Sequence, residues 1–276
     1  MEPPESFENG PFAGCAITVK SHDRARHDAL TAKGLTVPEI ADGCEAALVC
    51  IGRHRAANHA EIAQALEALS PGGLLLIDGQ KTDGMDSLVR LFRTHFDVAG
   101  VISKAHGKVL WLHRPESLPE IVASWRELGD LHPNQDGFYA APGMFSHDAI
   151  DPGTAFLAEH FAPAIAGRVA DLGAGWGALS SLLLAARPGI THIDLFEADK
   201  RAVDAAEANI SDPRAKVHWA DVTRLPAGQP YDAIVSNPPF HTTRKAEPSL
   251  GIAFIAAAAR LLAAKGTFQM VANRHL

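Results

Sequence analysis

The second half of the chain alternates between short apolar runs and longer amphipathic stretches, a pattern typical of strands separated by helices. The apolar runs end at glycine or at an acidic residue, and the stretches between them repeat apolar positions at helical spacing. The expected strands cover residues 168–172, 191–196, 216–219, 231–235 and 267–272, and the expected helices cover 178–186, 200–209 and 250–264. Such an order predicts an α/β fold with a doubly wound, parallel sheet that is covered on both faces.

The first half contains a fainter copy of the same plan. The run EAALVCIGRHR, a helix to Leu69 and the strand LLLIDGQ resemble YDAIVSNPPFH, a helix to Ala264 and the strand TFQMVAN of the second half. The first copy has no glycine-rich turn between strand and helix, and Gly52-Arg53-His54-Arg55 stands where the second copy has Asn-Pro-Pro-Phe. We therefore expect two Rossmann-like domains in tandem with mostly parallel sheets, of which the N-terminal one is degenerate and has lost its cofactor site.

Breaker residues place the boundary between these domains. The first domain is expected over residues 1–115, and the segment 116–137 is expected to be a linker with a short helix near 121–128, because it is rich in proline, glycine and asparagine. The second domain is expected over 138–276. In the first half the pattern continues past its LLLIDGQ strand with a helix and a closing hairpin, whereas the second half ends soon after Met270. The second domain is thus expected to lack its last strands.

A glycine-rich turn follows the first strand of the second domain. Residues 171–177 read Asp-Leu-Gly-Ala-Gly-Trp-Gly and open a helix. Glycines let the backbone bend tightly and approach a ligand, and the free N–H groups at the start of the helix attract polar or anionic atoms. The turn predicts a nucleotide-type ligand.

Acidic residues end the next two strands. Glu197 stands where a carboxylate accepts hydrogen bonds from ribose hydroxyls, with Asp199 as the second choice. Asp221 ends the third strand and could accept a hydrogen bond from an adenine amino group, or simply cap a helix. These residues therefore predict an adenosine-bearing ligand. They do not distinguish a nicotinamide cofactor from S-adenosylmethionine, because both carry a ribose diol.

The motif Asn237-Pro238-Pro239-Phe240 follows the apolar strand YDAIVS. The prolines fix the backbone and leave carbonyl groups free, the asparagine amide oxygen accepts a hydrogen bond, and the phenylalanine ring can stack on a flat ring. This combination predicts a grip on a planar NH2 group, with its nitrogen directed at a sulfonium methyl group.

The chain resembles class I S-adenosylmethionine-dependent methyltransferases in both motifs, in the acidic ends of its strands and in the segment before the glycine turn, GMFSHDAIDPGTAFLAEHF. The double-domain layout resembles the bacterial ribosomal RNA guanine-N2 methyltransferases of the small-subunit type. The resemblance implies transfer of a methyl group from S-adenosylmethionine to the exocyclic N2 amine of a guanine in ribosomal RNA. It implies catalytic roles for Asn237, Pro238, Pro239 and Phe240, and cofactor contacts by Asp171, Gly173, Ala174, Gly175, Gly177, Glu197, Asp221 and Asn237.

Composition narrows the remaining possibilities. The 47% apolar content and the net charge of −7 describe a globular protein rather than a general nucleic-acid coat protein. No apolar run is long enough to span a bilayer and the acidic start is not a signal peptide, so we expect a cytoplasmic protein that does not bind membranes. A monomer is expected as well. Three cysteines without CxxC spacing and histidines without HExxH spacing predict neither a disulfide framework nor a metal site.

The expected partner is ribosomal RNA or a ribosomal subunit. Three clusters of basic residues could hold RNA: His22, Arg24, Arg26 and His27; Arg53, His54, Arg55 and His59; and His241, Arg244 and Lys245. Surface Arg and His side chains are usually just solvated, and this interpretation is favoured for the first two clusters. For Arg244 and Lys245 a binding role is favoured, because the loop after the Asn-Pro-Pro-Phe motif must border the substrate entrance. Three other functions stay open, namely a protein N5-glutamine methyltransferase, a nicotinamide oxidoreductase and an inactive RNA-binding protein with a methyltransferase fold. The first shares the Asn-Pro-Pro-aromatic motif, and the second would leave that motif without a role.

Overall fold

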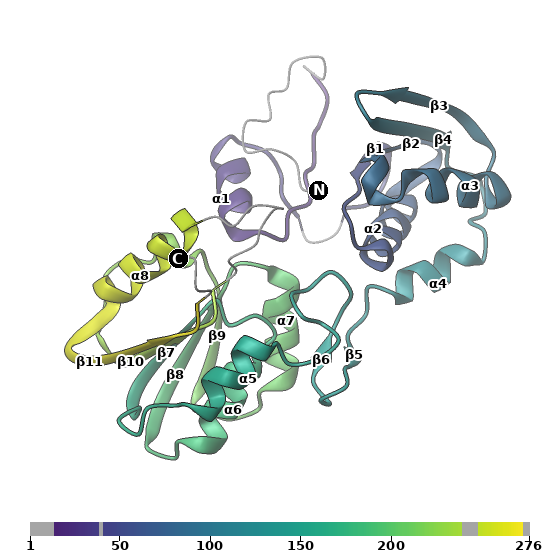
Figure 1. Cartoon of the computed structure of the whole chain (residues 1–276). Coiled ribbons are helices and arrows are strands. Elements are labelled where there is room, and N and C mark those ends of the chain that lie inside the picture. Colours follow the sequence, from purple (N-terminus) through teal and green to yellow (C-terminus); the bar gives the residue numbers. More distant parts are fainter. Residues whose placement is uncertain (1–13, 39–40, 239–247, 273–276) are drawn as a thin grey trace. The chain divides into compact units, whose positions relative to one another are not determined.

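The computed structural model describes residues 14–38, 41–238 and 248–272, which divide into two compact units (Figure 1). Unit 1 contains residues 14–21, Arg26–Asp130 and Ala141–Gly143. Unit 2 contains His22–Ala25, Leu131–Ala140 and the described residues from Met144 onward.

Unit 1 is built around a four-stranded mixed sheet with the order β1-β2-β4-β3. Strands β1 and β2 are parallel, and the β3–β4 hairpin joins β2 in antiparallel orientation, so this sheet is mixed rather than mostly parallel. Its elements are α1 (Arg24–Ala32, beginning in unit 2), β1 (Cys44–Cys50), α2 (Arg55–Ala68), β2 (Leu69–Gln80), the 3₁₀ turn η2 (Lys81–Asp83), α3 (Met85–His95), β3 (Val98–Lys104), β4 (Gly107–His113) and α4 (Ile121–Glu127).

The core of unit 1 lies on one face of this sheet. Alternate residues of the strands, such as Ile77 and Leu110, are buried against α2, α3 and α4, whereas Leu48 and Ile102 on the other face are 63% and 57% exposed. Helix α4 lies where a short helix was expected within the linker segment, and the buried indole of its Trp125 packs in this core. Burial of this large aromatic side chain attaches the helix to the core of unit 1.

Unit 2 contains a five-stranded parallel sheet with the order β11-β10-β7-β8-β9. Its elements are the short strands β5 (His132–Pro133) and β6 (Tyr139–Ala140), α5 (Pro152–Glu159), β7 (Gly167–Leu172), α6 (Ala178–Ala186), β8 (Ile190–Glu197), α7 (Lys200–Asn209), β9 (Ala215–Trp219), the 3₁₀ turn η3 (Val222–Arg224), β10 (Tyr231–Ser236), α8 (Pro248–Leu261) and β11 (Leu262–Met270). Apolar clusters cover both faces of the sheet, with α5 and α6 on one and α8 on the other. Burial on both faces explains why consecutive residues in the middle of β7 and β10, at 169–170 and 233–235, are apolar and completely buried.

A polar cluster around Asp194 joins four strands of this sheet. The carboxylate, 5% exposed, accepts hydrogen bonds from Arg168 at 2.7 Å, His218 at 2.7 Å and the Tyr231 hydroxyl at 2.8 Å, and lies 3.1 Å from His192 Nε2. Burial raises the pKa of Asp194, but the hydrogen bonds from His218, Tyr231 and His192 outweigh it and hold this pKa well below its usual range. The hydrogen bonds of this cluster thus compensate the buried negative charge of Asp194 inside the sheet.

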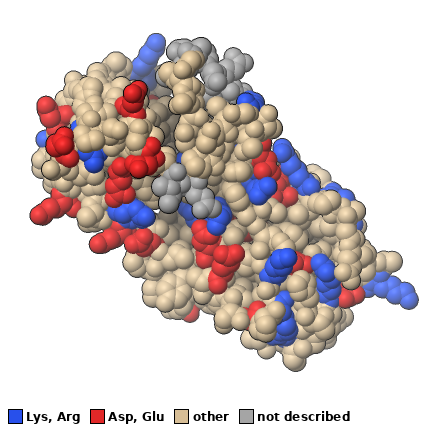
Figure 2. All heavy atoms as spheres, turned by 180° about the vertical axis from the view of Figure 1, so that it is seen from behind, with Lys and Arg blue, Asp and Glu red and all other residues tan. Residues whose placement is uncertain are grey.

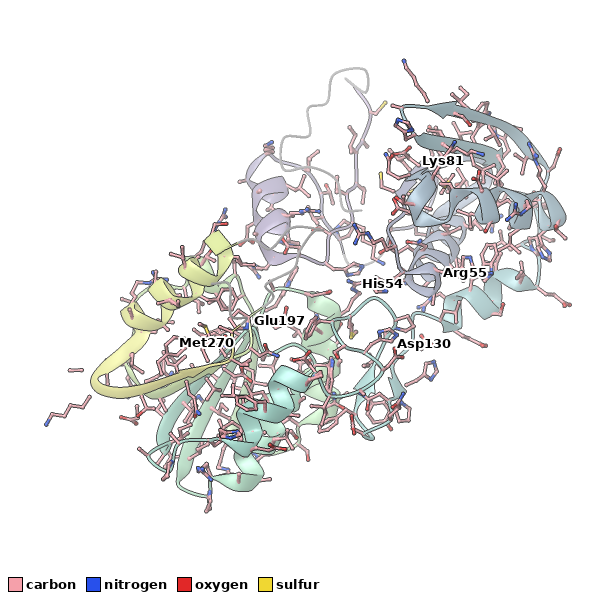
Figure 3. All side chains as sticks on the ribbon, in the orientation of Figure 1. His54, Arg55, Lys81, Asp130, Glu197 and Met270 are labelled. Carbon is pink, nitrogen blue, oxygen red and sulfur yellow. The ribbon has the colours of Figure 1, made fainter. Side chains whose placement is uncertain are left out.

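The parallel topology brings the predicted motifs to one edge. Chain order reverses between β7 and β10, which are neighbours in the sheet, and such a reversal opens a crevice at the carboxyl ends of the strands. The buried Ser236 hydroxyl donates a hydrogen bond of 2.6 Å to the Leu172 carbonyl, which ties the ends of these two strands together. Figure 3 shows Glu197 and Met270 at the ends of β8 and β11.

Candidate active site

The glycine-rich turn adopts backbone angles that side chains rarely tolerate. Gly173, Gly175 and Gly177 have φ angles of +75°, +56° and +90°. A Cβ atom on Gly175 would meet open space, whereas one on Gly177 would lie 2.9 Å from Ile210 Cδ1. Gly175 thus leaves the backbone accessible to a ligand, and Gly177 allows α6 to pack closely against the end of α7.

Glu197 lies directly beside this turn. Its Oε2 accepts a hydrogen bond from Gly175 N at 2.8 Å, and its Oε1 accepts from the N–H groups of Ala198 and Asp199, each at 2.8 Å. Burial is the largest influence on the Glu197 pKa and raises it, although these backbone donors lower it in part. The carboxylate is thereby oriented at the carboxyl edge of the sheet, where a diol could donate to its remaining lone pairs.

Asp171 is completely buried at the end of β7. Ser180 Oγ donates to its Oδ2 at 2.7 Å, while Oδ1 has no hydrogen-bond partner among the described residues. Burial raises the pKa of Asp171 to about 7, and the negative charge of Glu197 adds to the rise, against the lowering effect of Ser180. Two acidic groups with raised pKa values thus lie at one edge of the sheet, and such groups are common at functional sites.

Asp199 and Asp221 are both engaged as caps. Asp199 caps α7 and forms a salt bridge with Arg201 at 2.7 Å. Asp221 caps η3, where its Oδ1 accepts from the N–H and the hydroxyl of Thr223. The capping role that the sequence left open for Asp221 is therefore present in the structure.

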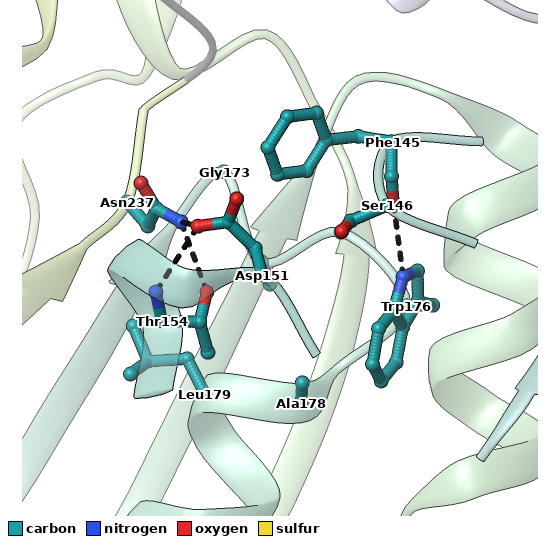
Figure 4. Close-up of a pocket in the computed structure, with 11 residues that line it drawn as sticks. Phe145, Ser146, Asp151, Thr154, Gly173, Trp176, Ala178, Leu179 and Asn237 are labelled. Carbon is teal, nitrogen blue, oxygen red and sulfur yellow. Dashed lines mark hydrogen bonds between the residues drawn. The ribbon is translucent and has the colours of Figure 1, made fainter. Parts of the chain in front are cut away.

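Asn237 and the glycine turn line the same pocket (Figure 4). This pocket also contains Asp151, Thr154 and Phe145. Asn237 Nδ2 donates to Asp151 Oδ2 and to Thr154 Oγ1, both at 2.9 Å. Pro238, the next residue, is buried, while Pro239 and Phe240 lie outside the described residues.

The segment before α5 contributes residues that sequence reasoning did not single out. Phe145 is 63% exposed on the wall of the pocket, and its carbonyl accepts a hydrogen bond of 3.0 Å from Trp176 Nε1. The next residue, Ser146, has a φ angle of +49°, which is uncommon for a residue with a side chain. The motif GMFSHDAIDPGT was the available signal, but nothing in its spacing indicates which of its side chains face the pocket.

The basic clusters considered for RNA binding have different environments. Arg24 lies over the Trp219 ring at 5.0 Å, and the backbone of His22 and Arg24 pairs with Ala198 and Lys200 within unit 2. This segment therefore borders the strand end that carries Glu197.

In unit 1, Arg53, His54 and Arg55 are exposed at the start of α2, where Figure 3 labels the latter two. His59 is only 7% exposed and stacks on Trp125 at 5.0 Å. Burial on the α2–α4 interface removes it from the surface, so it is neither a solvated side chain nor one of the possible RNA contacts. His241, Arg244 and Lys245 lie outside the described residues. On the face that Figure 2 shows, acidic and basic side chains occur together.

The described residues contain neither a cluster of metal ligands nor a membrane-spanning helix. No group of three or more His, Cys, Asp or Glu side chains in this part of the chain could hold a metal ion. Among the helices described, none has the length and apolar character needed to cross a membrane.

Comparisons with known proteins show a methyltransferase family. The family described as "Methyltransferase small domain" matches residues 136–276. The "Ribosomal RNA small subunit methyltransferase C" of Shewanella oneidensis is 32% identical over 77% of this chain and 63% of that protein, and its namesake in Shewanella loihica is 32% identical over 75% and 62%. The chain therefore spans less than two thirds of the length of these relatives.

A solved structure resembles both units. The T. thermophilus 16S rRNA N2 G1207 methyltransferase in complex with AdoMet and guanosine superposes with a TM-score of 0.79 and 26% identity. The match covers 96% of this chain and 76% of that one.

Proposed function

Because the chain belongs to the methyltransferase small-domain family, we propose that it transfers a methyl group from S-adenosylmethionine to the exocyclic N2 amine of a guanine in small-subunit ribosomal RNA. Its relatives are named for the small-subunit RNA, and the structurally similar T. thermophilus enzyme is described with AdoMet and guanosine. The substrate assignment rests on these names together with the chemistry of the site.

The observation that carries the proposal is the shared pocket of Asn237 and the glycine turn. A methyl donor and a planar amine must meet within one cavity for a direct transfer, and the pocket lies at the strand-order reversal where open α/β sheets bind ligands. If these two motifs lined separate cavities, the assignment would lose its basis.

The residues present fit S-adenosylmethionine. The open space at Gly175 leaves room for a ligand against the backbone, and the Glu197 carboxylate has acceptor capacity for ribose hydroxyls. Asp171 and Glu197 place buried acidic groups where a cationic ligand is favoured. In this arrangement Asp171, Gly173, Ala174, Gly175 and Gly177 hold the methionine part, Glu197 holds the ribose and Asp221 lies toward the adenine.

The chemistry that this chain supplies is binding and orientation. S-Adenosylmethionine, when bound, provides an electrophilic methyl group on a sulfonium. Asn237 Oδ1 and the carbonyl group of Pro238 accept hydrogen bonds from the guanine amine, and Phe240 stacks on the base. An amine becomes more acidic as its nitrogen gains a carbon, so its proton can pass to water while these acceptors stabilise the developing positive charge. No side chain is required as a general base.

The N-terminal half is, in this proposal, a degenerate methyltransferase domain that recognises RNA. The parallel pairs β1–β2 and β10–β11 share one irregularity, in which two residues along the first strand correspond to five along the second. The partners are Cys44 with Leu69 and Ala46 with Leu74, and Tyr231 with Leu262 and Ala233 with Thr267. A common irregularity at the same place in two units supports duplication.

In the first copy, the loop that corresponds to the proposed catalytic motif follows β1 and is held by a side chain of α2. Asn58 Oδ1 accepts a hydrogen bond from Gly52 N at 2.9 Å, and Asn58 Nδ2 donates to the Gly52 carbonyl at 2.7 Å. The exposed Arg53, His54 and Arg55 follow on this loop, and phosphate groups of RNA are their natural ligands. The domains of the proposal are 1–115, a connection over 116–137 and 138–276, acting as a monomer on ribosomal RNA in the cytoplasm.

The test is transfer of a radiolabelled methyl group from S-adenosylmethionine to three substrates: 16S ribosomal RNA, assembled small subunits and a release-factor protein. The proposal expects label in RNA or subunits, recovered as N2-methylguanosine after digestion. Label in the protein would favour the glutamine methyltransferase, and no label would favour the inactive RNA-binding protein. Calorimetric binding of NADH without binding of S-adenosylmethionine would contradict the cofactor assignment.

A further inference from the structure

The segment Asp151–Thr154 contacts the side chain of Asn237 across the pocket. Asp151 caps α5, and its Oδ2 accepts hydrogen bonds from the N–H groups of Gly153 at 2.8 Å and Thr154 at 3.1 Å. The same Oδ2 accepts from Asn237 Nδ2 at 2.9 Å, as does Thr154 Oγ1 (Figure 4). The two N–H bonds of the Asn237 amide thus have two acceptors, both supplied by the start of α5.

This arrangement determines which end of the amide is presented to the pocket. An ionised carboxylate accepts hydrogen bonds and donates none, so Asn237 must turn its NH2 group toward Asp151. Thr154 is 7% exposed, which keeps water from competing for the second N–H. With the NH2 group engaged, Oδ1 is the end of the amide that is left to accept a hydrogen bond from a ligand.

Neighbouring residues of the segment leave room for this contact. A Cβ atom on Gly153 would lie 2.8 Å from Asp151 Oδ2 and 3.6 Å from Asn237 Nδ2. Any larger residue at this position would therefore displace the carboxylate that holds the amide. Pro152 occupies the first turn of α5, where its missing N–H costs nothing and its fixed φ favours the helix.

We propose that Asp151 and Thr154 are positioning residues that fix the orientation of the Asn237 amide, so that the site presents an acceptor and selects an amino group over a carbonyl group. This inference rests on the proposed function, in which Asn237 contacts the guanine amine. A reversed amide would point N–H groups at the N–H groups of the substrate. The mismatch would cost catalysis while leaving the cofactor turn unchanged.

The first test compares two substitutions of Thr154. Thr154→Val keeps the shape but removes the acceptor, and Thr154→Ser restores the hydroxyl group. We expect Thr154→Val to lower kcat by about 10- to 100-fold, with KM for RNA and Kd for S-adenosylmethionine changed by less than about threefold, and Thr154→Ser to recover most of the kcat. Wild-type kcat in Thr154→Val, or an equal loss in both variants, would overturn the proposal.

The second test removes the charge from Asp151. Asp151→Asn retains a good N-cap, so α5 should still form, but its own amide can donate to Asn237 and allow the reversed orientation. We expect a kcat loss of the same order with an unchanged Tm. Asp212→Asn is the matched control, because Asp212 also accepts a backbone N–H two residues on but lies on another loop, outside the pocket. A similar kcat loss in the control would overturn the proposal.

The third measurement does not depend on catalysis. In NMR spectra of the full chain, both side-chain amide protons of Asn237, assigned by comparison with Asn237→Ser, should exchange slowly with water in the wild type and faster in Thr154→Val. Rapid exchange in the wild type would refute the inferred orientation. If the wild type methylates no RNA yet shows slow exchange, the proposed function fails while the orientation of the amide stands.

Discussion

Substitution of Asp171 by asparagine tests the charge of the cofactor site through pH-dependent stability. The pKa of this buried carboxyl is raised to about 7, mainly by burial, from an ordinary value of 3.8. A carboxyl that holds its proton more tightly in the folded protein destabilises the fold as pH rises, because the unfolded chain releases that proton first. The cost begins near pH 4 and is complete above pH 7, where a shift of roughly 3 units corresponds to about 4 kcal/mol.

Asp171→Asn removes this pH-dependent loss of stability and introduces a loss that does not depend on pH. The asparagine can still accept from Ser180, but its Nδ2 replaces the atom that has no partner among the described residues, at a cost of about 1–3 kcal/mol. The difference in unfolding free energy between variant and wild type should therefore shift in favour of the variant by about 2–3 kcal/mol from pH 5 to pH 8. Urea unfolding at four pH values across this range measures it.

The same substitution should weaken the binding of a cation. S-Adenosylmethionine carries positive charge, so its affinity for the wild type should fall below pH 7, where Asp171 must first lose a proton, and should depend less on pH in Asp171→Asn. A stability difference that is constant within about 0.5 kcal/mol between pH 5 and pH 8 would refute the reasoning, because it would mean that Asp171 does not titrate in this range.

Three further experiments test the glycine turn, the Asp194 cluster and the proposed RNA contacts of unit 1. Gly175→Ala should lower the free energy of unfolding by only the backbone strain of about 1–2 kcal/mol but abolish cofactor binding. Gly177→Ala should lower it by about 2–4 kcal/mol, because its methyl group would also lie 2.9 Å from an isoleucine. Urea unfolding measures the stability and calorimetry the binding, and equal stabilities of the two variants would contradict the role given to Gly177. Asp194→Asn should destabilise the protein by about 2–3 kcal/mol at pH 7. This loss should shrink as the pH falls below about 4, because a carboxyl with a lowered pKa progressively loses its stabilising effect there, and a pH-independent loss would contradict this. Replacing Arg53 and Arg55 by alanine should raise KM for RNA and flatten its salt dependence without changing binding of S-adenosylmethionine, and an unchanged KM would remove the proposed RNA contact.

The parts of the fold that the sequence predicts well are those with local boundaries. Helix α6 spans residues 178–186 as expected, since a glycine precedes it and Arg187-Pro188-Gly189 follows it. Helix α7 likewise spans the expected 200–209, between its Asp199 cap and the turn that leads to β9. The placement of Asn237 beside the glycine turn was also predictable, because parallel strands end at one edge of a sheet.

The parts that escaped prediction depend on contacts between distant residues. The bond between Asp151 and Asn237 joins positions 86 residues apart, and no periodicity reveals it. His59 was expected on the surface, and only its stacking on Trp125 shows that it is buried. The mixed sheet of unit 1 follows from where its hairpin docks, which local sequence does not determine.

The most direct test of the central claim is to separate cofactor binding from methyl transfer in Asn237→Ala. We expect the wild type to produce N2-methylguanosine in ribosomal RNA. In the variant, transfer should fall by about 100-fold or more while the Kd for S-adenosylmethionine stays within about threefold of the wild-type value. If the variant lost both cofactor binding and transfer, Asn237 would not act as the acceptor for the substrate amine. Transfer at the wild-type rate in the variant would contradict the assignment of this pocket as the active site.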